Sequence, residues 1–221
     1  AGKSTLMKVL QGVHPITSGE IEVNGEPVKI RNPADAERVG IGMVFQEFSL
    51  VPSMTVAQNI FLNRELRSKL GLIDDRAAER EAARIFADLG VSIDPAARVE
   101  TLGTAYWQLV EIAKAVAKNA TVLVMDEPTA SLASHEVERL FELIERLTAR
   151  GIAIVYISHR MDEIRRVAQR ITVLRDGRVV LSDRVADVEV AQIIEAIIGR
   201  RLASDLVYRE RERGVDDRVI L

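Results

Sequence analysis

Residues 121–128 read Thr-Val-Leu-Val-Met-Asp-Glu-Pro, an apolar run of strand length that ends in two carboxylates and a proline. Residues 152–157 read Ile-Ala-Ile-Val-Tyr-Ile, and the polar pair Ser158-His159 follows them directly. Between the two runs, Ser134 is a suitable N-cap for a connecting helix. Strands that are apolar throughout are typical of a parallel sheet buried on both faces. This stretch therefore predicts an α/β fold, a mostly parallel sheet with helices on both faces.

The neighbouring segments show helical and hairpin patterns. Apolar residues recur at helical spacing in four segments, residues 3–13, 108–118, 160–168 and 186–199. Asn24-Gly25 and Asp176-Gly177 each separate two short apolar runs, which predicts two β-hairpins. The first hairpin is expected to form a small antiparallel β-subdomain.

A helical insertion is expected after the strand candidate at residues 40–45, which ends at Gln46. Residues 55–90 read as helical, with Ala, Arg and Glu abundant after residue 74. This stretch interrupts the alternation of strands and helices. We therefore expect a helical subdomain at about residues 47–118.

Composition excludes several classes of protein. The 221 residues carry 30 Lys and Arg against 33 Asp and Glu, a net charge of −3, and no Cys. A slightly acidic chain has no general attraction to nucleic acid or anionic membrane, and disulfides are impossible. The longest apolar stretches, such as residues 152–157, fall far short of the roughly 20 residues that a membrane span needs.

Both ends of the chain read as truncated. The sequence opens at Ala1-Gly2-Lys3 with no Met and no preceding strand, and residues 208–218 are mostly charged before the apolar residues 219–221. A charged stretch followed by an apolar run indicates a linker that enters a new strand. We expect one domain at residues 1–207 and a linker at 208–221; the alternative is a complete protein with ragged termini.

Polar residues follow three of the expected strands. These residues are Gln46, the acidic pair Asp126-Glu127, and the pair Ser158-His159. Ligands bind outside the carboxyl ends of the strands in such sheets, so these side chains are expected to meet at one edge. Gly2-Lys3-Ser4-Thr5 opens a helix, whose backbone N–H groups and dipole attract anions. This set suits a magnesium nucleotide and a water molecule.

Each of these residues also has a simpler reading. The Gly-Lys-Ser-Thr tetrad is the tail of the phosphate-binding motif G-x-x-x-x-G-K-[ST], or an ordinary helix start with a Ser cap. Asp126 supplies the carboxylate expected on the Mg²⁺ side, and Glu127 can orient or deprotonate a water in line with a γ-phosphate, or be a solvated acid. His159 donates to the γ-phosphate or is an ordinary loop histidine. Gln46 contacts the metal or the water, or simply ends its strand.

Together these motifs resemble the ATP-binding subunits of ABC transporters. The matching segments are AGKSTLMKVL at 1–10, GMVFQEFSLVPSMTVAQNI at 42–60, VLVMDEPTASL at 122–132 and VYISHRMDEI at 155–164. The hairpin segments GEIEVNGEPV and ITVLRDGRVV match the family as well. VEIAKAVAKNATVLVMDEPTASL and YISHRMDEI are especially similar to the monosaccharide-import branch, whose chains carry two tandem nucleotide-binding domains. The similarity is to the first of these domains.

The resemblance implies ATP and Mg²⁺ as cofactors, and a role for each matching residue. Gly2 belongs to the phosphate loop, and Lys3 contacts the β- and γ-phosphates. Ser4 binds Mg²⁺, and Thr5 contacts the α-phosphate. The resemblance also implies that residues 1–207 are a nucleotide-binding domain without its N-terminal strand and first P-loop glycines, and that the linker leads to a second domain.

The same resemblance assigns the hydrolytic residues. Gln46 senses Mg²⁺ and the attacking water and relays their state to the helical subdomain. Asp126 holds Mg²⁺, Glu127 is the general base, and His159 clamps the γ-phosphate. Residues for adenine recognition would precede Ala1 and are not assigned.

Two segments depart from the family pattern. The signature L-S-x-G-Q, which caps the γ-phosphate of the opposite domain, is expected at Leu102, Gly103, Thr104, Ala105 and Tyr106. Gly103 lacks the hydroxyl of the usual Ser, and Ala105 adds a methyl group where the backbone should approach closely. Ala133 replaces the usual Asp after the acidic pair. We expect this domain's own site to be intact and the partner domain's site to be weakened.

The resemblance implies an ATPase that energises sugar import from the cytoplasmic face of the membrane, where it is peripheral. Its partners would be transmembrane permease subunits, a second nucleotide-binding domain in tandem or as a dimer and, indirectly, a solute-binding protein. One alternative is a soluble ABC-type ATPase acting on ribosomes or DNA. The short segment between Gln46 and Gly103 and the negative charge argue against it, so we expect no nucleic-acid partner. Another is a non-hydrolysing regulatory nucleotide binder.

Overall fold

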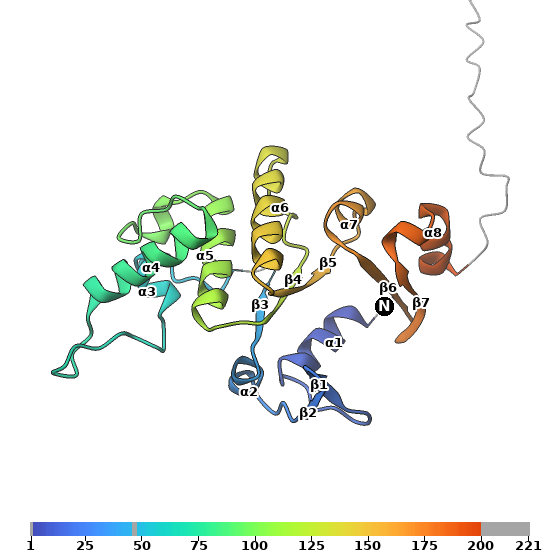
Figure 1. Cartoon of the computed structure of the whole chain (residues 1–221), viewed down its shortest axis with the longest axis horizontal. Coiled ribbons are helices and arrows are strands. Elements are labelled where there is room, and N and C mark those ends of the chain that lie inside the picture. The colour runs from blue at the N-terminus through green and yellow to red at the C-terminus, as the bar shows by residue number, and fades with distance from the viewer. Residues whose placement is uncertain (1, 46–47, 200–221) are drawn as a thin grey trace, which may run out of the picture.

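A three-stranded parallel sheet forms the centre of the computed structural model, which describes residues 2–45 and 48–199 (Figure 1). Its strand order is β3 (Ile41–Val44), β4 (Val122–Asp126) and β5 (Ala153–Ile157). The register pairs Val44 with Met125, and Asp126 with Ile157. Strand β4 therefore lies between two neighbours. Gln46 and the linker at 208–221 lie outside the described residues.

Helices cover both faces of this sheet, as the sequence predicted. Leu123 and Met125 of β4 are fully buried in the larger core, with α5 (Thr104–Ala117) and α6 (Ser134–Ala149). Val124 points to the opposite face, where it packs with Met7 of α1 (Lys3–Leu10) and with Ile157. The alternation of successive side chains along a strand thus divides one apolar run between two cores.

Both predicted hairpins are present. Strands β1 (Ile21–Val23) and β2 (Glu26–Val28) pair antiparallel, as do β6 (Arg170–Arg175) and β7 (Arg178–Arg184). Asn24 and Gly25 have φ values of 56° and 80°, and Asp176 and Gly177 have 50° and 73°. Two consecutive residues at positive φ are the turn geometry that matches the twist of hairpin strands.

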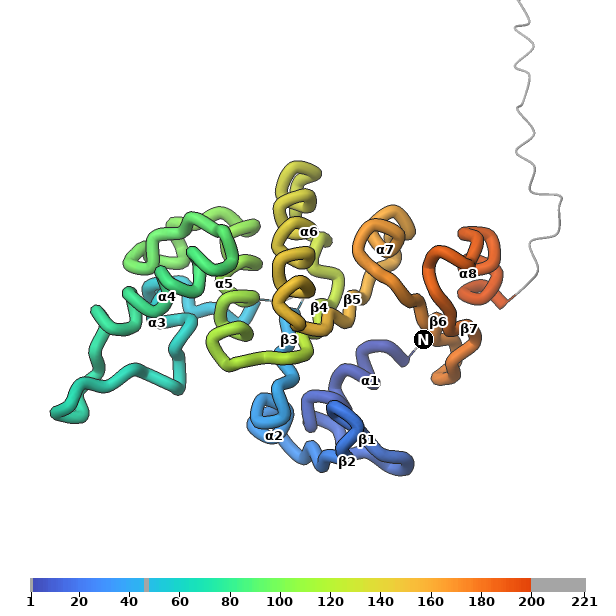
Figure 2. Tube along the Cα trace, viewed as in Figure 1, coloured from blue at the N-terminus to red at the C-terminus, as the bar shows by residue number. Residues whose placement is uncertain are grey.

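The helical insertion contains less helix than the sequence predicted. Its elements are α3 (Val56–Ile60), α4 (Asp75–Leu89), the 3₁₀ turn η1 (Val99–Thr101) and α5. The helical prediction is wrong for residues 61–74, where Asn63 and Gly71 have positive φ and Arg67 pairs with Ile73 in an antiparallel bridge. These backbone conformations cannot continue a helix. In Figure 2 the insertion lies at one end of the long axis, and β6, β7 and α8 (Val190–Ile198) lie at the other.

The remaining short elements are α2 (Pro33–Arg38), α7 (Met161–Val167) and the 3₁₀ turn η2 (Val185–Asp187). The N-cap of α6 is Ala133, so the prediction of Ser134 is wrong by one residue. The Ala133 N–H donates to Oε2 of Glu136 at 2.8 Å, so an acidic side chain in the first turn satisfies this backbone donor without a capping hydroxyl. No helix in the described parts of the chain has the length and apolarity needed to cross a bilayer.

Candidate functional site

The start of α1 presents unpaired backbone N–H groups. Gly2 occupies the N-cap position at φ 91° and ψ −2°, a left-handed conformation that favours glycine. No side chain caps this end of the helix, so the reading of Ser4 as a cap is wrong. Ser4 and Thr5 are exposed and Lys3 is half-buried. Free N–H groups, a helix dipole and an ammonium together favour a bound anion.

Asp126 ends β4 and interacts electrostatically with this helix start. Burial raises the pKa of the Asp126 carboxyl above its ordinary value, the adjacent Glu127 raises it further, and the Lys3 ammonium opposes the rise. Lys3 is thus close enough to influence Asp126, although the two residues are distant in sequence. The structure brings a cation, a hydroxyl-bearing helix start and a carboxylate to one region, as expected from the strand ends.

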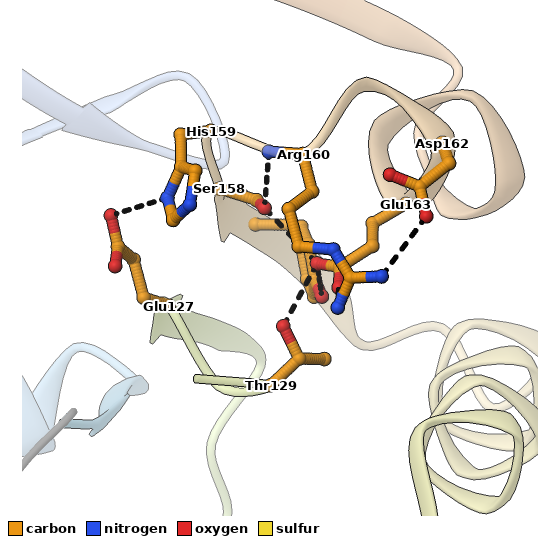
Figure 3. A network of polar contacts seen from close by, with 8 residues as sticks. Glu127, Thr129, Ser158, His159, Arg160, Asp162 and Glu163 are labelled. Atoms are coloured by element: carbon orange, nitrogen blue, oxygen red, sulfur yellow. Dashed lines mark hydrogen bonds and ion pairs between the residues drawn. The ribbon is translucent and has the colours of Figure 1, made fainter. Parts of the chain in front are cut away.

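Glu127 and His159 face each other across the ends of β4 and β5 (Figure 3). Nδ1 of His159 lies 3.2 Å from Oε1 of Glu127, and the two side chains are 71% and 29% exposed. The backbone N–H of Glu127 donates to the carbonyl of Ile157 at 2.9 Å, which extends the pairing of the two strands by one step. Glu127 has φ 45°, an uncommon value for a residue with a side chain.

A buried carboxylate lies behind this pair, and the sequence reasoning did not identify it. Glu163 in α7 is only 1% exposed. Its Oε2 accepts hydrogen bonds from Thr129 Oγ1 at 2.9 Å, from Tyr156 OH at 2.8 Å and from Ser158 Oγ at 3.0 Å. Its Oε1 forms an ion pair with Nη1 of Arg160 at 2.8 Å. Sequence spacing does not predict this burial, because the hydroxyl donors come from two separate segments of the chain.

The signature-like segment belongs to a different element. Gly103 is the N-cap of α5, with no side-chain cap, at φ −69° and ψ 159°. Behind it, Nε1 of Trp107 donates to the carbonyl oxygens of Val99 at 2.8 Å and Leu102 at 3.1 Å. The ring of Trp107 also packs edge-on against Phe48, with centroids 5.6 Å apart. The segment is therefore anchored within the helical insertion, and its residues 103 and 104 are exposed.

The side chains present suit a hard cation that is shared with phosphates. Across residues 2–45 and 48–199, no three His, Cys, Asp or Glu side chains form a group that could hold a metal ion. The available ligands are the Ser4 hydroxyl and the Asp126 carboxylate. Mg²⁺ usually takes one or two protein oxygens and completes its shell with water and substrate phosphates, so this donor set fits Mg²⁺.

Comparisons with known proteins agree with this geometry. The family model described as ABC transporter matches residues 1–130. The ribose import ATP-binding protein RbsA 3 of Rubrobacter xylanophilus is 47% identical over 97% of this chain and 43% of its own length. A putative ribose/galactose/methyl galactoside import ATP-binding protein of Burkholderia lata is 47% identical over 93% of this chain and 40% of its own length. The chain thus spans about two fifths of these relatives.

Solved structures show the same fold. The ADP conformation of an ATP-binding cassette of an ABC transporter matches with a TM-score of 0.74 and 25% identity, over 90% of this chain and 84% of that one. A nucleotide-free ATP-binding cassette from an ABC transporter matches with a TM-score of 0.73 and 25% identity, over 90% of this chain and 80% of that one. The parallel sheet, its helices and the small antiparallel sheets therefore follow the architecture of these cassettes.

Proposed function

Because the chain belongs to the ABC transporter family, we propose that it binds and hydrolyses ATP to energise import of a sugar through a separate membrane permease. The observation that carries this proposal is the contact between Glu127 and His159, at 3.2 Å, at the sheet edge where Lys3 acts on Asp126. The names of the relatives, which are import proteins for ribose and galactose, support a sugar as the cargo.

The start of α1 would hold the triphosphate. The N–H groups after Gly2 and the Lys3 ammonium neutralise phosphate oxygens, and the Thr5 hydroxyl adds a donor on the same turn. Ser4 and Asp126 would hold Mg²⁺, which when bound neutralises charge that develops on the phosphates. Gln46, outside the described residues, is proposed as a further ligand of the metal and the water.

Glu127 and His159 would carry out hydrolysis. Oxygen of a water attacks the γ-phosphorus, a proton of that water passes to the Glu127 carboxylate, and the bond to the leaving ADP oxygen breaks. His159 contacts Glu127 through Nδ1, and its Nε2 would contact the γ-phosphate. The high exposure of its ring, 71%, leaves room for that phosphate contact.

The partners follow from the same family membership. We propose that residues 1–207 are one nucleotide-binding domain and that residues 208–221 lead to a second. Residues 102–106 would face the γ-phosphate of that second domain. The protein would act at the cytoplasmic face of the membrane, bound to permease subunits and dependent on a solute-binding protein only indirectly.

The test measures ATP hydrolysis and sugar uptake together in vesicles that hold the assembled transporter. Glu127→Gln is expected to lower hydrolysis by about 100- to 10,000-fold while ATP still binds, because a general base contributes that range. Lys3→Ala is expected to weaken ATP binding instead. Glu138→Gln changes an exposed acid on α6 and serves as the matched control. Wild-type hydrolysis in the Glu127→Gln variant would refute the assigned base, and hydrolysis without uptake would refute the transport role.

A further inference from the structure

We propose that Glu163 is a positioning residue for hydrolysis, which holds the two loops that carry Glu127 and His159 in register with each other. This inference rests on the proposed function. It starts from the cost of burying a carboxylate: at 1% exposure, a charge is stable only if it is paired and hydrogen-bonded. Glu163 meets this condition with hydrogen bonds to three hydroxyl groups and an ion pair with Arg160.

Two of the hydrogen-bond donors to Glu163 come from the loops that carry Glu127 and His159. Thr129 lies two positions after Glu127, and Ser158 immediately precedes His159. Both hydroxyls donate to the same oxygen, Oε2 of Glu163, at 2.9 and 3.0 Å. One buried atom therefore ties the loop after β4 to the loop after β5. Figure 3 shows these side chains converging on Glu163 beside the Glu127–His159 pair.

The remaining contacts fix the carboxylate itself. Tyr156 donates to Oε2 at 2.8 Å from within β5, and its burial and this hydrogen bond raise the pKa of the phenol, which keeps the proton on the donor. Arg160 compensates the charge at Oε1, and its backbone N–H donates to Ser158 Oγ at 3.0 Å. Asp162 contacts the same guanidinium at 3.1 Å from the exposed side. The carboxylate thus contacts one residue of β5, one residue of each loop, and the N-cap residue of its own helix.

A positioning role predicts a specific kinetic signature. Glu163→Ala is expected to lower kcat by about 10- to 100-fold, because misplacement of reacting groups by an ångström has effects of this size. The KM for ATP is expected to stay within about twofold, because the groups proposed to bind phosphate, Lys3 and Ser4, belong to α1. Thr129→Val, which removes one of the two loop contacts, is expected to give a smaller loss of kcat.

Two controls separate this role from general destabilisation. Thr148→Val removes a threonine hydroxyl that donates only within α6, at 3.0 Å to Ile144, and is expected to leave kcat unchanged. Leu147→Ala creates a cavity in the core and is expected to lower the melting temperature, which gives the kinetic signature of general destabilisation. The rates of all variants are divided by the folded fraction of each protein. The conservative variant Glu163→Gln is expected to recover part of the kcat that is lost in Glu163→Ala.

Hydrogen exchange gives a readout that does not depend on turnover. In Glu163→Ala, the segments at residues 127–133 and 158–160 are expected to exchange faster together, while α8 keeps its protection. Unchanged exchange in either loop would overturn the proposal. So would kcat and KM that change only in proportion to the folded fraction, as in Leu147→Ala. A wild type without ATPase activity would instead refute the proposed function and leave the exchange result to decide on the two loops.

Discussion

Replacing Gly103 by Ser is expected to stabilise the protein and, in combination with a second change, to raise its ATPase activity. Gly103 is the N-cap of α5 at φ −69° and ψ 159°, a conformation that any residue adopts. A Cβ atom at this position would meet no heavy atom within 4 Å. A Ser side chain therefore fits without strain, and its hydroxyl can accept from the free N–H groups of the first helical turn.

The magnitude follows from two independent contributions. Replacing glycine at a compatible position lowers the conformational entropy of the unfolded chain, which raises the free energy of unfolding by about 0.4–1 kcal/mol. Serine is a better N-cap than glycine by a few tenths of a kcal/mol. The sum is about 0.5–1.5 kcal/mol, which shifts Tm by roughly 1–6 °C in a chain of this length.

The assay is urea unfolding followed by fluorescence of Trp107, the single tryptophan of the chain, which lies on α5 itself. Gly103→Ala is the matched control because it restricts the unfolded chain equally but cannot cap the helix. The free energy of unfolding of the Ala variant is expected to be about 1 kcal/mol lower than that of the Ser variant. Equal stability of the Ser and Ala variants would refute the capping argument.

The functional part of the prediction uses a double variant. Ala105→Gly in the first turn of α5 costs about 0.5–1 kcal/mol, which offsets the gain from Gly103→Ser and leaves stability nearly unchanged. A hydrogen bond to a charged phosphate contributes about 1.5–3 kcal/mol, so in a full-length protein that contains both proposed nucleotide-binding domains the double variant is expected to hydrolyse ATP roughly 10-fold faster or more. Unchanged turnover would show that the departures at these two positions are harmless.

Two further predictions concern stability. The Asp126 carboxyl has a pKa raised above 3.8, so wild-type stability falls as pH rises through that raised value. Asp126→Asn is therefore expected to be more stable than wild type at pH 7 and equal to it below about pH 3.8, the ordinary pKa, as measured by urea unfolding at both pH values. Gly42→Val is expected to destabilise by about 1–3 kcal/mol, because a Cβ on β3 would lie only 3.0 Å from Cβ of Ala120 and 3.1 Å from Cβ of Ala115. A thermal melt of Gly42→Val like that of wild type would contradict this packing.

The sequence predicted the elements whose signal is local. Asn24-Gly25 and Asp176-Gly177 determine their turns by backbone preference alone, and both hairpins were confirmed. The apolar run of β4 predicted a buried parallel strand, because helices on both faces of such a sheet bury the side chains that point to either face. From that topology we predicted that Glu127 and His159 lie at the same edge of the sheet; their direct contact is a finding of the structure.

Local sequence patterns contain no comparable signal where tertiary contacts decide the structure. Residues 61–74 share a subdomain with true helices, but Gly71 and a local bridge between Arg67 and Ile73 turn the backbone instead. Glu163 reads as an ordinary acid in the first turn of a helix, where acids favour the dipole. Its burial depends on hydroxyl groups from Thr129 and Tyr156, which sequence spacing does not connect.

The backbone of Glu127 has a consequence for attempts to make this protein more robust. The other four described non-glycine residues with positive φ are Asn24, Asn63, Asn119 and Asp176, side chains that tolerate this conformation. Glu127 is the exception, so a library screened for heat resistance alone would favour glycine or asparagine there. Such a screen would enrich well-folded molecules that have lost the proposed general base, and any stabilised variant needs an activity check at this one position.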